Sequence, residues 1–169
     1  RVTSGTAWSS GLNSSCANNV GQLGMFTHQN RHELAHVMQN LIPQGTVTAW
    51  MNEGFPEFYS NRGPISQKVI DSERSRLKSA MDAAIAYHKH RPTYEESRIY
   101  PTYDYYLLGK YFVDFIYRKG GGHQGLKDIY SNDVAAYAKL GYASAEAFMS
   151  AFYYDFDVRI MQKPIVQLL

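Results

Sequence analysis

The stretch from His32 to Asn61, "HELAHVMQNLIPQGTVTAWMNEGFPEFYSN", predicts two consecutive helices. The first starts after a cap at Thr27, and "IPQG" ends its apolar pattern, which recurs at three- and four-residue spacing in Leu34, Val37, Met38 and Leu41. The second begins near Trp50 to Glu53 and runs to about Asn61. We expect Pro56 near its first turn, where a missing amide costs least.

The first of these helices carries a metal-binding pattern. His32 and His36 are four residues apart, so their side chains lie about 40° apart around a helix axis and one turn along it. Both imidazoles can reach one ion, and Glu33 can hydrogen-bond a water on that ion without binding it. Zinc lowers the pKa of such a water to about 7. We therefore predict one catalytic Zn²⁺, bound by His32 and His36, with Glu33 as the general base.

A catalytic zinc needs a third protein ligand, for which Glu53 is the candidate. It follows His36 by 17 residues, across a turn that lets the second helix fold back on the first. Glu57 falls on the same face as Glu53 and could accept the spare ring N–H of a ligand histidine, which would orient that ring. His28 shares the four-residue spacing with His32, but no glutamate beside it supplies a base. We place His28 near the rim of the cleft.

The rest of the chain predicts further helices, at about 66–90, 102–118, 123–130, 133–140 and 144–161. The expected class is mainly α, α+β at most: an active-site helix, a glutamate helix, a C-terminal helical bundle, and a small or truncated N-terminal β part. We expect one catalytic domain over residues 1–169. Its parts are an irregular segment with short strands (1–27), a zinc-binding helix pair (28–61) and a helical support subdomain (62–169). The other histidines, His88, His90 and His123, are expected to be solvated.

Composition excludes several classes of partner and site. The net charge of +2 is spread along 169 residues, which predicts no binding of nucleic acid, and no apolar run is long enough to predict a membrane span. The single cysteine, Cys16, excludes an internal disulfide or a cysteine-based zinc cluster. Because the chain begins with Arg1 and has no signal-like segment, we expect a processed product or part of a longer protein.

The pair "HELAH" and "WMNEGFPEFY" resembles the gluzincin zinc metallopeptidases, which include aminopeptidase N, thermolysin-like enzymes and bacterial collagenases. The resemblance implies the same zinc ligands and the same general base, acting on peptide or protein substrates. It extends to "YYLLGKYFVDFI", where a tyrosine three residues before a glycine stabilises the oxyanion in the aminopeptidase N branch. Tyr106 with Gly109 matches that pattern, and Tyr105 is the alternative.

The upstream segment "GQLGMFTHQN" departs from the aminopeptidase pattern because it lacks the glutamate that binds the free amine of the substrate. We therefore expect an endopeptidase, with an aminopeptidase as the alternative. A protein-binding module with a peptidase fold but no catalysis, and a purely structural helical domain, are the alternatives of other classes.

Overall fold

The computed structural model describes residues 9–10, 14–15, 28–39, 48–61, 63–132 and 136–161. Helices make up most of this part of the chain, which confirms the predicted mainly α class. They are α1 (His28–Gln39), α2 (Ala49–Ser60), α3 (Gln67–His88), the 3₁₀ turn η1 (Glu96–Arg98), α4 (Tyr105–Lys119), α5 (His123–Asn132), α6 (Ala136–Lys139), α7 (Ala145–Phe156) and the π-helical turn η3 (Asp157–Met161). None of the described helices has the length and apolar run that a membrane crossing requires.

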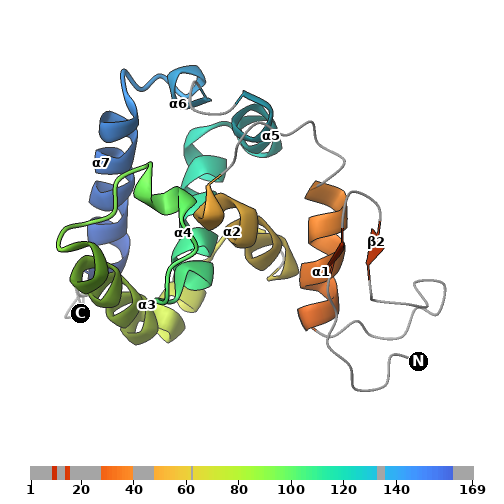
Figure 1. Cartoon of the computed structure of the whole chain (residues 1–169), viewed down its shortest axis with the longest axis horizontal. Helices are drawn as coiled ribbons and strands as arrows, with labels where there is room; N and C mark the ends of the chain where they lie inside the picture. Colours follow the sequence, from red (N-terminus) through yellow and green to blue (C-terminus); the bar gives the residue numbers. More distant parts are fainter. Residues whose placement is uncertain are drawn as a thin grey trace, which may run out of the picture.

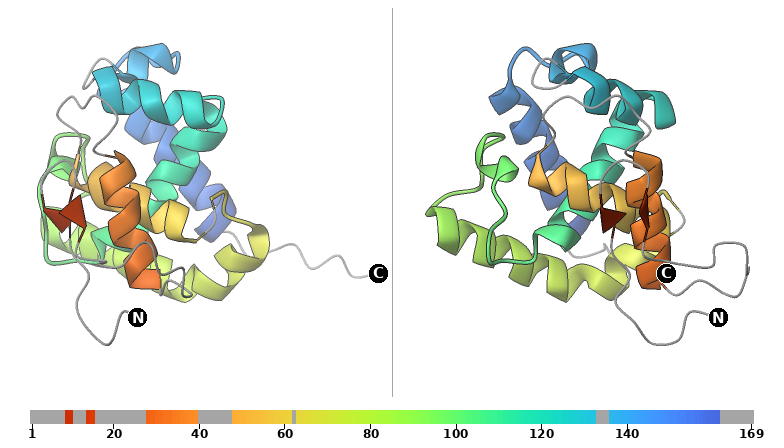
Figure 2. Two further views of the ribbon diagram at one scale, coloured as in Figure 1. Left: turned by 90° about the vertical axis from the view of Figure 1, so that its right-hand side faces the viewer. Right: turned by 45° about the vertical axis from the view of Figure 1, so that its right-hand side comes forward.

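The helices are arranged around α2 and α4, which cross near the middle of the molecule (Figure 1). The long helix α3 and α7 lie on one side of this crossing, and α1 lies on the other, next to α2 (Figures 1 and 2). Two-residue strands beside α1, β1 (Ser9–Ser10) and β2 (Ser14–Ser15), pair antiparallel. The apolar residues at 20–26 and residues 40–47, where the sequence predicts a turn, lie outside the described residues.

Most helix starts follow from a capping side chain. A polar side chain accepts a hydrogen bond from the backbone amide three residues later at Thr48 for α2, Ser66 for α3, Asp104 for α4 and Ser144 for α7. Such bonds satisfy amides that have no partner within the helix. The helix starts expected from the sequence therefore agree with the structure to within a few residues.

The predicted place of Pro56 is wrong. Because Thr48 caps α2 and its hydroxyl accepts from the Met51 amide at 3.1 Å, the helix begins at Ala49 and Pro56 is its eighth residue. A proline there leaves the carbonyl four residues earlier, on Asn52, without its helical amide partner. Glu53 accordingly projects from the second turn of α2 rather than the first.

Helix α4 is the centre of the core, since every residue from Leu107 to Ile116 is buried. Its own aromatic side chains, Phe112 and Phe115, pack against Trp50, Phe148 and Phe152 from the neighbouring helices. Its two buried charges are paired, as a buried ion requires. Lys110 donates to both carboxylate oxygens of Glu73 at 2.9 Å, and Asp114 accepts from Arg118 and Arg159.

Two glycines allow α2 and α4 to approach closely. A Cβ on Gly109 would clash with the carbonyl oxygen of Trp50, and a Cβ on Gly54 would clash with the backbone of Gly109. The missing side chains let the two backbones touch. This close approach places the start of α4 beside the middle of α2, where Glu53 lies.

We expect Gly109→Ala to lower the free energy of unfolding by at least about 2 kcal/mol, because the methyl group overpacks the crossing of α2 and α4. The sign of the change in the free energy of unfolding is informative, since alanine in a helix interior otherwise stabilises by about 1 kcal/mol relative to glycine. Urea unfolding of the metal-free chain measures the effect. Ser79→Ala, at an exposed position of α3, is the control and should stay within about 0.5 kcal/mol of the parent. Equal stability of the two variants would contradict the close approach.

Candidate metal centre

The predicted metal ligands meet between α1 and α2, which lie side by side (Figure 2). His32 Nε2 lies 3.4 Å from Glu53 Oε2, and His36 Nε2 lies 3.2 Å from the same oxygen. The donor atoms of the three residues all lie within 4.8 Å of one another. The structure therefore brings His32, His36 and Glu53 together as a group that could hold a metal ion.

The other ring nitrogen of each histidine faces an acceptor. His32 Nδ1 lies 2.9 Å from Glu57 Oε1, and His36 Nδ1 lies 3.1 Å from Gln39 Oε1. With its proton on Nδ1, each ring donates to that acceptor and presents the lone pair of Nε2 to the centre of the group. Such contacts fix both the tautomer and the ring plane of a metal-binding histidine. Glu57 is thus in contact with one of the predicted ligands, as expected.

Gln39 and Asn52 connect the second histidine to the glutamate, a link that the sequence interpretation missed. The Gln39 side chain is fully buried, and its amide nitrogen donates to Asn52 Oδ1 at 3.1 Å. Asn52 Nδ2 then donates to Glu53 Oε1 at 3.2 Å and to the hydroxyl of Tyr100 at 3.1 Å. A continuous chain of hydrogen bonds therefore runs from His36 to Glu53. The sequence gives only a modest signal for this chain of hydrogen bonds: Gln39 follows His36 by three residues, and Asn52 directly precedes Glu53.

Burial and charge act in opposite directions on the groups of this centre. Burial disfavours the charged form of His32, but its hydrogen bonds to Glu53 and Glu57, with their negative charges, outweigh this and raise the pKa of His32 to about 9. Burial likewise disfavours the Glu53 carboxylate, yet hydrogen bonds from His32 and His36 lower the pKa of Glu53 to about 2. At neutral pH the metal-free centre therefore holds a proton on His32, which a metal ion would have to displace.

Glu33 lies on α1 directly after His32 and is half-buried. It is not a member of the three-residue group whose donor atoms converge. Its expected role as the general base, in contact with a water on the metal, stays a prediction.

Tyr106, near the start of α4, lies against the same centre. Its ring centroid is 5.9 Å from that of His32, its hydroxyl contacts Glu53, and its side chain is 39% exposed. Burial, together with the contacts to Tyr105 and Glu53, raises the pKa of Tyr106 well above its usual range. Tyr105 packs against Tyr100 and Tyr106. Tyr106 is therefore the better placed of the two candidate tyrosines.

Among the described side chains, His88, His90 and His123 are not members of the converging group. The side chain of His28 lies outside the described residues. His88 was expected to be solvated, which is wrong: its side chain is 5% exposed, because it packs between Tyr103 and Glu96. His90 is exposed and pairs with Glu96 at 3.0 Å. His123 is exposed as expected, although its ring stacks on Tyr59.

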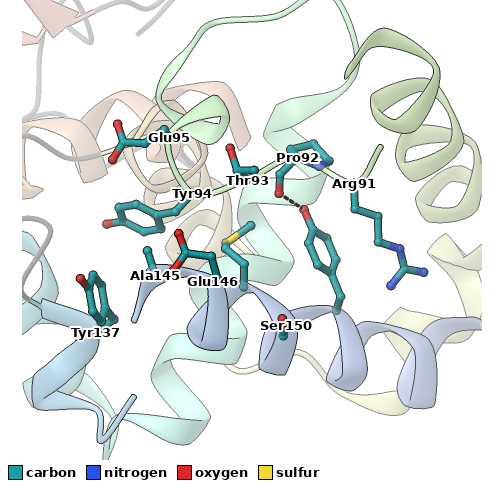
Figure 3. Close-up of a pocket in the computed structure, with 11 residues that line it drawn as sticks. Arg91, Pro92, Thr93, Tyr94, Glu95, Tyr137, Ala145, Glu146 and Ser150 are labelled. Carbon is teal, nitrogen blue, oxygen red and sulfur yellow. Dashed lines mark hydrogen bonds between the residues drawn. The ribbon is translucent and has the colours of Figure 1, made fainter. Parts of the chain in front are cut away.

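Of two cavities in the described part of the chain, one shares no lining residue with this centre and the other adjoins it. One of about 490 Å³ lies between residues 91–95 and α7, and Figure 3 shows acidic side chains, Glu95 and Glu146, along with Tyr94 and Tyr137 in its wall. Its lining includes none of the candidate site residues. The second cavity, of about 300 Å³, is lined by both Glu57 and Tyr106 and therefore adjoins the metal centre.

Comparison with known proteins adds no relative: no family model, curated protein or solved structure matches the chain. The chemistry of the site therefore has to be argued from its own geometry.

We expect Gln39→Leu to weaken zinc binding by about 10- to 100-fold, because the change removes the acceptor for His36 Nδ1 and the donor to Asn52 at similar side-chain volume. Competition with a chromophoric chelator at constant pH measures the affinity, and circular dichroism checks that the helices persist. Gln124→Leu makes the same change at an exposed position of α5 and should leave the affinity unaltered. An unchanged affinity in a folded Gln39→Leu chain would show that the hydrogen-bond chain does not orient the ligands.

Proposed function

We propose that this chain is a zinc-dependent metallopeptidase of the gluzincin type, acting as an endopeptidase on peptide or protein substrates. One observation carries the proposal: the Nε2 atoms of His32 and His36 both point at one carboxylate oxygen of Glu53, at 3.4 and 3.2 Å. Each Nδ1 meanwhile has an acceptor. Helix stability alone does not require this convergence of three candidate ligands from two helices.

The donor set fits zinc. Two imidazole nitrogens and one carboxylate oxygen make a His₂Glu set, which in catalytic zinc sites leaves a position for water or substrate. The acceptors at Glu57 and Gln39 supply the outer contacts that such histidines use. Zinc held there would contribute Lewis acidity, polarising a carbonyl oxygen and making water a nucleophile at neutral pH.

The chain's own residues then handle the protons and the developing charge. Glu33 accepts a proton from the attacking water and passes it to the nitrogen of the leaving amine. Tyr106 donates its phenolic hydrogen to the carbonyl oxygen as negative charge builds on it. The raised pKa of Tyr106 keeps that hydrogen in place at physiological pH. The lack of a glutamate amine clamp in the sequence upstream of α1 favours an endopeptidase over an aminopeptidase.

Glu33→Gln should lower kcat/KM on an unstructured protein substrate by about 10²- to 10⁴-fold, because the amide cannot accept the proton. Zinc content and the free energy of unfolding should stay near those of the parent, since Glu33 is not one of the converging ligands. Glu95→Gln, at a side chain 70% exposed, is the matched control and should retain full activity.

Three results would go against the proposal. They are no bound zinc by elemental analysis, cleavage that resists chelation, and a Glu33→Gln chain as active as the parent. Partner binding that survives Glu33→Gln, with no turnover in either protein, would favour a binding module instead.

Tyr106→Phe should reduce kcat by about 10²- to 10³-fold with little change in KM, since only the transition state carries the charge that the hydroxyl stabilises. Tyr105→Phe removes the same atom one residue earlier and should have a small effect. Steady-state kinetics on one peptide measure both variants. A larger loss from Tyr105→Phe would reverse the assignment of the two tyrosines.

A further inference from the structure

The cavity next to the metal centre is polar and lined from three helices. Its wall includes Glu57 of α2, Glu73 and Arg76 of α3, and Tyr106 and Lys110 of α4, with Asp104 at the start of α4. Glu57 also contacts His32, and Tyr106 lies against the ring of His32. A peptide whose scissile bond lies at the metal centre would therefore have one side chain next to this cavity.

The deepest charges of the cavity already balance each other. Lys110 is 2% exposed, and its ammonium group donates to both oxygens of Glu73 at 2.9 Å. The hydroxyl of Tyr111 donates to Glu73 as well, at 3.0 Å. If either the ammonium of Lys110 or the carboxylate of Glu73 left this pair, the other charge would remain buried without a partner, which is costly. Lys110 is therefore not available to bind an anion.

The second cation, Arg76, is held much less firmly. Its side chain is 67% exposed, and it reaches Asp104 Oδ2 at 3.4 Å, where Asp104 is itself 44% exposed. Exposed pairs of this kind contribute little to stability. The other oxygen, Asp104 Oδ1, is fixed by the amide of Leu107 at 3.1 Å. The carboxylate of Asp104 thus stays in place while Arg76 can be exchanged for another cation.

We infer that this cavity binds the side chain of a lysine or arginine next to the scissile bond, so that the substrates are peptides and proteins cut beside a basic residue. The inference rests on the proposed peptidase function. A cation entering here replaces Arg76 at Asp104 and faces Glu57. An acidic side chain would instead face the carboxylates of Glu57 and Asp104, because Glu73 and Lys110 neutralise each other. The volume of about 300 Å³ suits a single long side chain.

The test uses internally quenched peptides, blocked at both ends, that contain one lysine, arginine, norleucine or glutamate in a fixed neutral sequence. We expect kcat/KM to be at least about tenfold higher for lysine and arginine than for norleucine, and lowest for glutamate. Mass spectrometry should locate the cut on the same side of every basic residue. Lysine and norleucine have similar length, so the comparison isolates the charge.

Variants of the cavity should change this preference in opposite directions. Asp104→Asn keeps an oxygen to cap α4 but removes the charge, and should lower the lysine-to-norleucine ratio about three- to tenfold. Arg76→Ala removes the competing cation and should raise the ratio. Asp82→Asn, at an exposed position of α3 outside the cavity, is the matched control and should leave the ratio unchanged.

A binding measurement separates the two proposals. In the zinc-loaded Glu33→Gln chain, the lysine peptide should bind at least about tenfold more tightly than the norleucine peptide. Equal cleavage of all peptides would leave the peptidase proposal standing and overturn the basic preference. Binding that favours the lysine peptide, with no cleavage by the parent chain, would support the basic preference of the cavity and overturn the peptidase proposal. A preference for glutamate, or a requirement for a free N-terminal amine, would also overturn the inference, and failure to bind or cleave any peptide would remove both proposals.

Discussion

The contact between Gly54 and Gly109 sets the separation of α2 and α4, and the geometry of the candidate site depends on that separation. Glu53 immediately precedes the first glycine, and Tyr106 lies one turn before the second. Close contact of the two backbones therefore brings the carboxylate and the phenol together. Gly109 is thus a packing requirement, and its contact with α2 fixes where Tyr106, three residues earlier, lies relative to Glu53.

The candidate metal centre is organised by partners that lie outside its three converging residues. Glu57 and Gln39 determine which nitrogen of each ring faces inward, and Asn52 holds the oxygen of Glu53 that does not face the histidines. In the metal-free chain, a proton on His32 balances part of the negative charge of this group. A bound cation would take over that electrostatic role, so the site suits a metal both in geometry and in charge.

Most of the helices, and the convergence of the two histidines, could be predicted from the sequence because they depend on residues that are close together in the chain. Helical periodicity predicts the helices, and the four-residue spacing of His32 and His36 places both rings on one face. The predicted place of Pro56 in the first turn of α2 is wrong because the cap at Thr48 is a stronger start signal for this helix than the proline. The hydrogen bond from Gln39 to Asn52 could not be predicted, since it depends on how α1 is positioned against α2. The burial of His88 likewise depends on packing between distant segments.

The attachment of α1 differs from that of the other long helices. Whereas α4 is buried against α2, α3, α5 and α7, the described contacts of α1 are mainly with α2 and the two short strands. Helix α1 nevertheless supplies both histidines, while Glu53 and Glu57 belong to the main body. Local opening of α1 would therefore separate the ligands without unfolding the core. Any ion bound by both helices would act as a clasp, and its affinity would include the free energy of holding α1 closed.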